Sequence, residues 1–350
     1  MLCLLSFGRF LRGVAAVGFL LSAALPSARA GAREDFLKVI DRPRVPLAPA
    51  NEPTTVTNGL EQAHFSFAAD ARQRVPGIWV RRAGDAGGRR PVVIVMHGTG
   101  GRKENELPRL RRLAERGFLA VAIDGRYFGE RSRTGTGTAD YEDAIVRAYR
   151  GNGEHPLYYD TVWDVLRLVD YLETRPEVDA RRIGLTGISK GGIETYLAAA
   201  ADPRFAVVVP FIGVQEFNWG LEHNAWQGRV ATVPHAFATL WHEAGLTNAN
   251  AAFARMFFDH LIPGIYTQFD GPAFLPLIAP RPLLVVNGDS DDHTPLPGVE
   301  HCGEAAKRAY AAAGVPEHFQ LIIQEHTAHK VNPASDDAML EWFAKWLAAP

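Results

Sequence analysis

The stretch Ile183-Gly-Leu-Thr-Gly-Ile-Ser-Lys-Gly-Gly192 decides the fold of this 350-residue chain. Residues 183–186 form an apolar run typical of a buried strand, and residues 192–201 have the composition of a helix. Between them Ser189 stands in the pattern G-x-S-x-G. A serine on a sharp turn between strand and helix needs glycine neighbours, because side chains there would clash. Two interpretations are open: a catalytic serine, or a glycine-rich turn with a capping serine.

Segments typical of strands and helices alternate around this stretch. Continuous runs of Val, Ile, Leu and Ala, as in strands buried on both faces, begin at Val92, Leu119, Ile183, Ala206 and Leu283. Further strands are expected at 64–69, 77–82 and 319–325, and helices at 107–116, 159–175, 192–201, 299–313 and 336–347. This alternation predicts an α/β fold with a mostly parallel central sheet and helices on both faces.

One segment, 214–279, separates two predicted strands by far more than an ordinary connection does. It is rich in aromatic residues, namely Phe217, Trp219, Trp226, Phe237, Trp241, Phe253, Phe257 and Phe258. We predict a helical cap over the ends of the strands. The alternative is a long crossover whose aromatic side chains pack into the main core.

The N-terminus has the pattern of a secretory signal peptide. Arg9 and Arg12 precede a short apolar run at 13–25, and Ala28-Arg-Ala30 is a small-residue cleavage site. The run is too short to span a bilayer comfortably, so an uncleaved anchor is the weaker alternative. We therefore expect cleavage after Ala30 and a secreted or periplasmic protein with no stable membrane span.

The predicted domains are a signal peptide at 1–30, an extended lead-in at 31–60 and one domain at 61–350. Cys3 lies in the predicted signal peptide and leaves Cys302 alone, so no intrachain disulfide is expected. The formal net charge of −2 and the scattered basic residues give no sign of a surface for nucleic acid.

A catalytic serine needs a base in contact with it and an acid behind that base, and in this type of site the chain order is Ser, acid, His. Gly288-Asp-Ser-Asp-Asp-His-Thr-Pro295 follows one late predicted strand, and His326-Thr-Ala-His-Lys-Val331 follows the last. Both loops would lie at the carboxyl ends of parallel strands, where open α/β sheets place their sites. The acid is then Asp289, Asp291 or Asp292, and the base is His326 or His329.

These motifs resemble the α/β-hydrolase superfamily over nearly all of residues 60–350. The G-x-S-x-G-G stretch is similar to the branch that holds acetyl xylan esterases, dienelactone hydrolases and prolyl-oligopeptidase-type domains. That branch's G-x-x-D-x-x-V/T-P pattern falls on residues 288–295 and implies Asp291 as the acid. Its small-His-x-Val pattern falls on residues 328–331 and implies His329 as the base.

The resemblance implies a serine hydrolase with the α/β-hydrolase fold. His329 would take the proton of Ser189, Asp291 would orient the imidazole, and water would hydrolyse the acyl-enzyme. The oxyanion hole would consist of the backbone N–H groups of Lys190 and Thr99. Thr99 lies in the 95–101 loop, which resembles the family's H-G-x-G stretch, and His97 is expected to support that loop.

Three further residues are candidates for contacts with the substrate. Arg126 lies in Asp124-Gly-Arg-Tyr-Phe-Gly-Glu-Arg-Ser132. This segment resembles the family's D-x-R-x-x-G-x-S turn, whose Asp and Arg usually brace loops near the site. Arg126 could instead bind substrate, and Trp219 and Trp226 of the insertion are the other two candidates.

We therefore expect a serine carboxylic-ester hydrolase acting on short-chain, sugar or aromatic esters. One alternative is a serine peptidase or amidase of prolyl-oligopeptidase type, although the lead-in is too short for the β-propeller of such enzymes. Another is a non-catalytic binding protein on a hydrolase scaffold. Because no zinc-helix, P-loop or dinucleotide motif is present, we expect no cofactor, no metal and no nucleic-acid partner, only a small-molecule or carbohydrate-linked ester.

Overall fold

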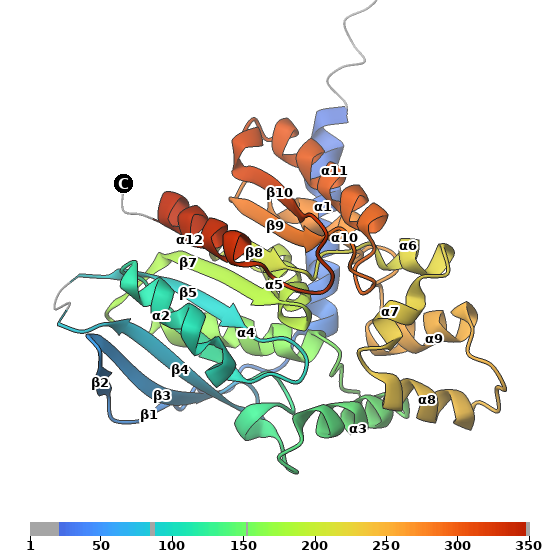
Figure 1. Ribbon diagram of the computed structural model, residues 1–350, viewed down its shortest axis with the longest axis horizontal. Coiled ribbons are helices and arrows are strands. Elements are labelled where there is room, and N and C mark those ends of the chain that lie inside the picture. The colour runs from blue at the N-terminus through green and yellow to red at the C-terminus, as the bar shows by residue number, and fades with distance from the viewer. Residues whose placement is uncertain (1–20, 85–87, 152, 348–350) are drawn as a thin grey trace, which may run out of the picture.

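A mixed β-sheet forms the centre of the molecule (Figure 1). The computed structural model describes residues 21–84, 88–151 and 153–347, so most of the predicted signal peptide lies outside the described residues. Within them the strands follow the order β1-β3-β4-β6-β5-β7-β8-β9-β10, with β2 beside β3. The strands are β1 Ala50–Asn51, β2 Thr55–Thr57, β3 Leu60–Ala68, β4 Arg74–Arg82, β5 Arg90–Met96, β6 Leu119–Ile123, β7 Val178–Ile188, β8 Phe205–Phe211, β9 Leu283–Gly288 and β10 Phe319–Gln324.

The strands from β5 to β10 pair in parallel, whereas β1 to β4 pair antiparallel and β4 joins β6 in the same way. The eight strands expected from the sequence are all present. In β5, Val92 and Ile94 belong to the core on one face of the sheet, and Val93 and Val95 to the core on the other. This division explains why the strand is apolar at every position rather than at alternate ones.

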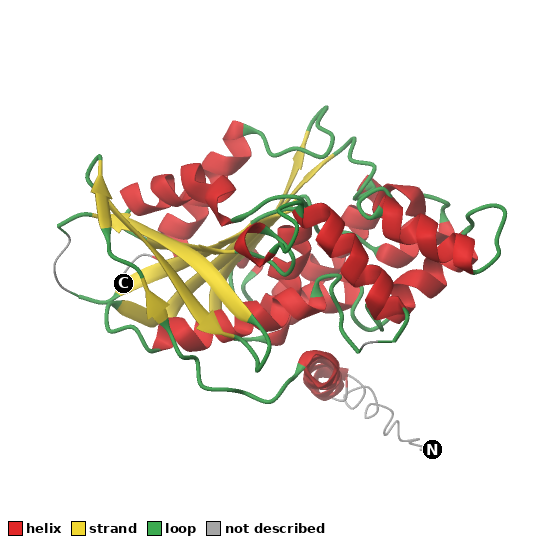
Figure 2. Cartoon of the chain, turned by 90° about the horizontal axis from the view of Figure 1, so that it is seen from below, coloured by secondary structure: helices red, strands yellow, loops and turns green. Residues whose placement is uncertain are grey.

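Helices cover both faces of the sheet (Figure 2). Helices α2 and α12 pack on one face, and α4, α5 and α11 on the other. Their bounds are α2 Leu107–Glu115, α4 Tyr159–Glu173, α5 Lys190–Ala201, α11 Leu296–Ala312 and α12 Pro333–Leu347. An additional helix, α3 Gly137–Tyr149, was not expected, and short 3-10 turns are η1 Lys103–Glu106, η2 Gly129–Arg131, η3 Leu275–Ile278 and η4 Pro316–His318. The predicted α/β architecture is confirmed.

The segment expected as an extended lead-in begins with a helix instead. Helix α1 spans Leu21–Ile40 and continues past the predicted cleavage site. Arg33 donates a hydrogen bond to the carbonyl of Ala200 at 2.8 Å, and the buried ring of Phe36 meets that of Tyr159 edge to face. Residues 31–40 are helical because their apolar side chains pack on α4 and α5. No helix in the described ranges is both long and apolar enough to cross a bilayer.

The insertion at 214–279 is helical, as expected, and lies beside α3 at one end of the molecule (Figure 1). Its helices are α6 Phe217–Glu222, α7 Trp226–Val230, α8 Pro234–Glu243, α9 Ala251–Leu261 and α10 Gly271–Phe274. Phe237 packs edge to face against Phe253 and Phe257, each at 5.2 Å between ring centroids. These rings join the core shared with α4 and α5, so the cap and the main domain bury one continuous aromatic core. The aromatic side chains of the segment thus pack into the main core, as the alternative interpretation expected.

Candidate active site

Ser189 occupies a strained turn between β7 and α5. Its φ and ψ are 56° and −116°, a conformation that costs energy in any residue other than glycine. A Cβ at position 187 would lie 2.4 Å from the carbonyl oxygen of Gly191, and one at position 191 would lie 2.5 Å from that of Met96. The flanking glycines are therefore required by contacts between backbones, which is the steric basis of a nucleophile elbow.

The hydroxyl of Ser189 lies at one end of a continuous chain of hydrogen bonds. It donates to Nε2 of His329 at 2.7 Å, and Nδ1 of His329 donates to Oδ2 of Asp291 at 2.7 Å. The three residues follow three different strands, β7, β9 and β10, at their carboxyl ends. This is the geometry in which a histidine withdraws a proton from a serine while an aspartate fixes its tautomer.

Asp291 is buried, with 3% of its surface exposed, yet it is surrounded by donors. Besides His329, it accepts hydrogen bonds from the hydroxyl of Thr294 at 2.7 Å and from the backbone N–H of His293 at 2.9 Å. Burial alone would raise the pKa of Asp291, but the hydrogen bonds from His329 and Thr294 outweigh it and the pKa is lowered. Asp291 is therefore an anion that can stabilise a charged imidazole.

The other candidates in these two loops have different partners. Asp289 accepts hydrogen bonds from the backbone N–H groups of His326 at 2.9 Å and Thr327 at 3.0 Å, and so ties the two loops together. Asp292 and His326 are exposed. A Cβ at Gly288 would lie 2.1 Å from the carbonyl oxygen of Thr327, so the loops also touch through their backbones. The structure brings Asp291 and His329, not these neighbours, to Ser189.

The loop expected to supply an oxyanion donor lies beside the nucleophile. A Cβ at Gly98 would be 3.5 Å from Cβ of Ser189. His97 accepts a hydrogen bond from the backbone N–H of Gly125 at Nε2, 2.9 Å, and donates from Nδ1 to the carbonyl of Gly98, 2.8 Å. Burial, followed by the nearby Lys190 ammonium, lowers the pKa of His97 to about 4. A neutral His97 thus braces the loop that carries Thr99.

Lys190 has separate backbone and side-chain surroundings. Its backbone N–H lies in the first turn of α5, where amide groups have no acceptor within the helix. Its buried ammonium group pairs with Glu194 one turn later and lies over the rings of Phe128 and Tyr141. The side chain is therefore occupied, and the backbone N–H is the part of Lys190 suited to an oxyanion.

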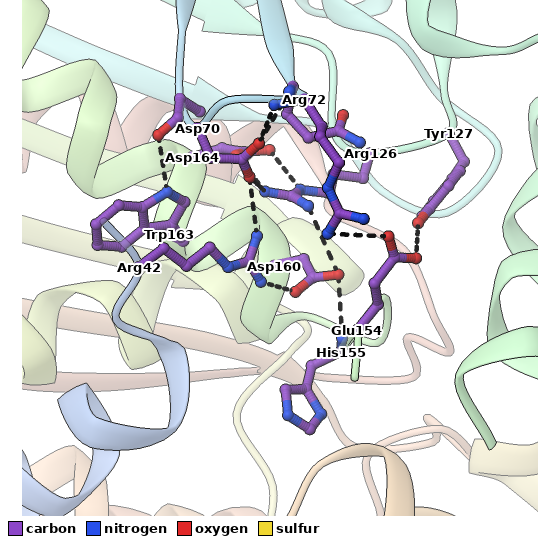
Figure 3. Close-up of polar contacts among 12 residues, drawn as sticks. Arg42, Asp70, Arg72, Arg126, Tyr127, Glu154, His155, Asp160, Trp163 and Asp164 are labelled. Carbon is purple, nitrogen blue, oxygen red and sulfur yellow. Dashed lines mark hydrogen bonds and ion pairs between the residues drawn. The ribbon is translucent and has the colours of Figure 1, made fainter. Parts of the chain in front are cut away.

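Arg126 lies in a buried network of charges (Figure 3). Its guanidinium donates to Asp164 at 2.9 and 3.1 Å and to Asp70 at 3.1 Å, and Asp160 lies 3.8 Å away. Burial opposes the charge, but the three carboxylates hold the pKa of Arg126 above its ordinary value. Arg42 pairs with Asp160 and Asp70 in the same network. Arg126 connects the loops after β3 and β6 to α4.

A groove of about 640 Å³ lies between the cap and the loop that carries Asp291. Trp219 and Gln227 line it from the cap, and Asp289 and Asp292 line it from the loop. The Trp219 ring stacks on His223 with the centroids 4.3 Å apart. Trp226 is not in this groove, because its ring is 8% exposed and packs near Phe237 in the aromatic core.

One group of side chains in the described ranges has ligand atoms close enough for a metal ion: His64, Glu104 and Glu130. The buried ammonium of Lys103 contacts Glu104 at 2.8 Å and also pairs with Glu130. It reaches Asp124 at 3.0 Å as well. The Lys103 ammonium thus already pairs with both carboxylates of this group, which does not favour a resident cation there.

Two residues near the triad were not expected from the sequence. Thr294 donates to Asp291, and its hydroxyl accepts from Asn287 at 3.0 Å, so it links the acid to the end of β9. The ring of His293 lies 4.5 Å from that of His329. Their closeness in sequence to Asp291 was the available signal, because a buried carboxylate needs several donors and residues of its own loop are within reach.

Comparisons with known proteins find similarity to hydrolases and esterases. Residues 78–242 match the Dienelactone hydrolase family. The esterase candidate YitV of Bacillus subtilis (strain 168) is 28% identical over 266 residues, 73% of this chain and 89% of that protein. A 4-O-methyl-glucuronoyl methylesterase of Wolfiporia cocos is 27% identical over 53% of this chain, which spans 45% of that longer protein.

Among solved structures, an acetyl xylan esterase from Paenibacillus sp. R4 superimposes with a TM-score of 0.61. It is 18% identical and the match covers 96% of this chain and 97% of that one, so it shows a shared fold. The sheet, the family match and the relatives agree on one description: the chain has an α/β fold of the α/β-hydrolase type and is similar to esterases of that superfamily.

Proposed function

We propose that Ser189, His329 and Asp291 form the catalytic triad of a carboxylic-ester hydrolase. The observation that carries this proposal is the pair of 2.7 Å hydrogen bonds that join the three side chains. His329 takes the proton of Ser189 as the hydroxyl attacks the ester carbonyl, and returns it to the leaving alcohol. Water, activated by the same imidazole, then hydrolyses the acyl-enzyme.

The oxyanion of the tetrahedral intermediate is stabilised by the backbone N–H groups of Lys190 and Thr99. The place of Lys190 in the first turn of α5 supports this assignment, as does the closeness of Gly98 to Ser189. Fixed backbone donors of this kind cost no reorganisation during the reaction. The neutral His97 keeps the Thr99 loop in place.

The substrate is a polar ester, and an esterified sugar fits best. The groove beside Asp291 offers the aromatic face of Trp219 together with the amide of Gln227 and the carboxylates of Asp289 and Asp292. An apolar face with a few polar groups suits a hydroxyl-rich ligand. The names of two similar proteins, an acetyl xylan esterase and a glucuronoyl methylesterase, support the same class. Arg126 holds the loops after β3 and β6 on α4 and does not bind substrate, because its guanidinium is already paired with three carboxylates.

Hydrolysis of p-nitrophenyl acetate, butyrate and octanoate, followed by acetylated xylan and a methyl glucuronate ester, tests this function. We expect activity that falls with acyl chain length, acts on one of the two carbohydrate esters and disappears in Ser189→Ala. Cleavage of proline-containing peptides without ester hydrolysis would move the chain to the peptidases. A folded wild type with no activity on any of these would contradict the proposal.

Export with cleavage after Ala30 is a further part of the proposed function. Ala32 and Arg33, just after that site, pack on the domain, so cleavage would leave these contacts in place. The molecular mass of the protein recovered from the periplasm or medium of an expressing bacterium tests it. A mature chain that starts at Gly31 is the expected result, and an intact N-terminus would contradict it.

A further inference from the structure

A second histidine, His293, lies against the imidazole of His329 and takes no part in the proton transfers proposed above. The ring centroids are 4.5 Å apart and the planes meet at 67°, so the edge of one ring faces the other. Contacts of this T-shaped kind are favourable and directional. The His329 imidazole therefore has a third neighbour besides the two that bind its nitrogens.

The backbone of His293 is held on both sides. Its N–H donates to Oδ1 of Asp291 at 2.9 Å, and its carbonyl accepts a hydrogen bond from Nη2 of Arg229 at 2.6 Å. Arg229 belongs to α7 of the cap and is 6% exposed. Within the described ranges no carboxylate pairs with it, and its other contact is the hydroxyl of Tyr158 at 3.4 Å. The buried guanidinium of Arg229 thus donates its hydrogen bonds to uncharged oxygens, one of which is the carbonyl oxygen of His293.

The neighbouring residue of α7 brings the cap directly onto the same loop. A Cβ at Gly228 would lie 1.9 Å from the carbonyl oxygen of Asp292 and 3.4 Å from Cα of His293. Only glycine allows so close an approach of the two backbones. Helix α7 therefore fixes the position of His293 by contact as well as by the hydrogen bond from Arg229.

The charged groups that face His293 are Asp291, His329 and Arg229. Burial, then His329 and Arg229, lower the pKa of His293 below its ordinary value, with Asp291 opposing them. At neutral pH His293 is therefore uncharged. A neutral neighbour does not oppose the charge that His329 gains in each catalytic cycle, whereas a cation would.

We propose that His293 is a positioning residue for the His329 imidazole and that the cap holds it there through Arg229 and Gly228. The inference rests on the proposed function, because it gives His293 a role only if Ser189 and His329 act together. Two hydrogen bonds in the ring plane leave the imidazole free to tilt about the line that joins them. Contact with the His293 ring limits that tilt, so its loss lowers the rate of the chemical step. His293 also lines the groove beside Asp291, so the effect on kcat is measured separately from the effect on KM.

The test compares His293→Ala, His293→Phe, Arg229→Met and the double variant His293→Ala/Arg229→Met on p-nitrophenyl acetate. Active sites are counted by titration with a fluorophosphonate, and His235→Ala, an exposed histidine on α8 of the same cap, is the matched control. We expect His293→Ala to lower kcat per titrated site by about 10- to 100-fold with KM within about threefold, the size of effect that a small misplacement causes. Phe restores kcat to within about threefold, since it keeps the ring edge.

Arg229→Met has a separate expectation, because Arg229 acts through His293. It lowers kcat in the wild-type background and has a smaller effect when His293 is already alanine, which a double-mutant cycle measures. Equal effects in both backgrounds would contradict this coupling. If His293→Ala does not fold, His293→Leu fills the same space without a flat edge, and the comparison of Leu with Phe decides.

The possible failures are distinct. An active wild type whose His293→Ala variant keeps its kcat overturns the inference and leaves the proposed function intact. A Phe variant as slow as the Ala variant also overturns it, because the ring edge would then be irrelevant. A wild type that hydrolyses no ester and is not labelled at Ser189 overturns both.

Discussion

The proposed triad, which is partly exposed, and the buried Arg126 network are two polar clusters in one domain, and they differ in how completely their groups are paired. In the network, the positive charge of Arg126 is paired with the carboxylates of Asp70, Asp160 and Asp164. In the triad the chain of hydrogen bonds ends at the Ser189 hydroxyl, whose oxygen has only His329 as a side-chain partner among the described residues. A fully paired cluster braces the fold, whereas a cluster with one open end can react.

The largest effect on activity is expected from the loss of His329, which is the partner of the Ser189 hydroxyl. His329→Asn should lower kcat/KM on p-nitrophenyl acetate by about 10⁵-fold, since removing a triad member leaves only the oxyanion hole and binding. The matched control is His326→Asn in the same loop, because His326 is exposed and its φ of 49° is one that asparagine tolerates. Equal losses in the two variants would contradict the assignment of the base.

The next effect concerns the acid behind the histidine. Asp291→Asn keeps the shape of the side chain but removes its charge and favours the wrong tautomer of His329. We expect kcat to fall by about 10⁴-fold with little change in KM. Steady-state kinetics beside Asp143→Asn, an exposed position on α3, measure this. A loss below tenfold would mean that another carboxylate serves His329.

A substitution in the Arg126 network should lower the stability of the fold and leave the activity nearly unchanged. Arg126→Met removes the cation shared by Asp70 and the buried Asp160 and Asp164. Arg42 and Arg131 still pair with these carboxylates, so the free energy of unfolding should fall by at most about 3–5 kcal/mol. The kcat per titrated active site should stay within a few-fold, because the reacting groups are untouched. Denaturant unfolding together with active-site titration measures both, and a variant that is fully stable but inactive would give Arg126 a role at the substrate.

The stability lost in Arg126→Met should depend on pH. Burial would raise the pKa of Asp164, but Arg126 and Arg131 lower it below 3.8, so its pairing stabilises the fold above that pH and is lost as the pH falls further. The difference in unfolding free energy between wild type and Arg126→Met should therefore narrow below pH 3.8. A constant difference would show that the loss comes from packing and not from charge.

The smallest expected effect is the change in stability caused by His97 in the 95–101 loop. His97 has a pKa of about 4 in the folded chain against 6.5 in a free one, so the unfolded state binds its proton first as the pH falls. The free energy of unfolding should drop between pH 6.5 and about 4, by about 3 kcal/mol at most. His97→Gln should lack this part of the slope in urea unfolding curves. An unchanged slope would place its origin elsewhere.

The same contrast explains what could be read from the sequence. The strand β5 and the elbow at Ser189 leave a signal in their own residues, namely a continuous apolar run and flanking glycines, although distant segments supply the contacts that require them. Choosing Asp291 over Asp289 needed a family pattern, because the two carboxylates are chemically alike and only the loop geometry separates them. The carboxylate partners of Arg126 come from two distant segments, the loop after β3 and helix α4, and no local signal connects them.

Helices α1 and α3 were missed for a different reason. The prolines at 43, 46, 49 and 53 led to an extended prediction for the whole of 31–60, although residues 31–40 contain none. In α3 the buried residues Tyr141, Ile145 and Ala148 have helical spacing, so the signal was present there too. The groove beside Trp219 could not be predicted, because it depends on how the cap folds back over the loop.

The crowding of backbones at the elbow also has a consequence for how this enzyme can change. A side chain at Gly187, Gly191 or Gly192 would have to displace the main chain of Met96, Phe211 or the turn itself. In a random library that varies these positions, most members would therefore fail to fold. New substrate preferences are accessible at Trp219, Gln227 and Ala231 of the cap, where variation changes the groove without moving the sheet.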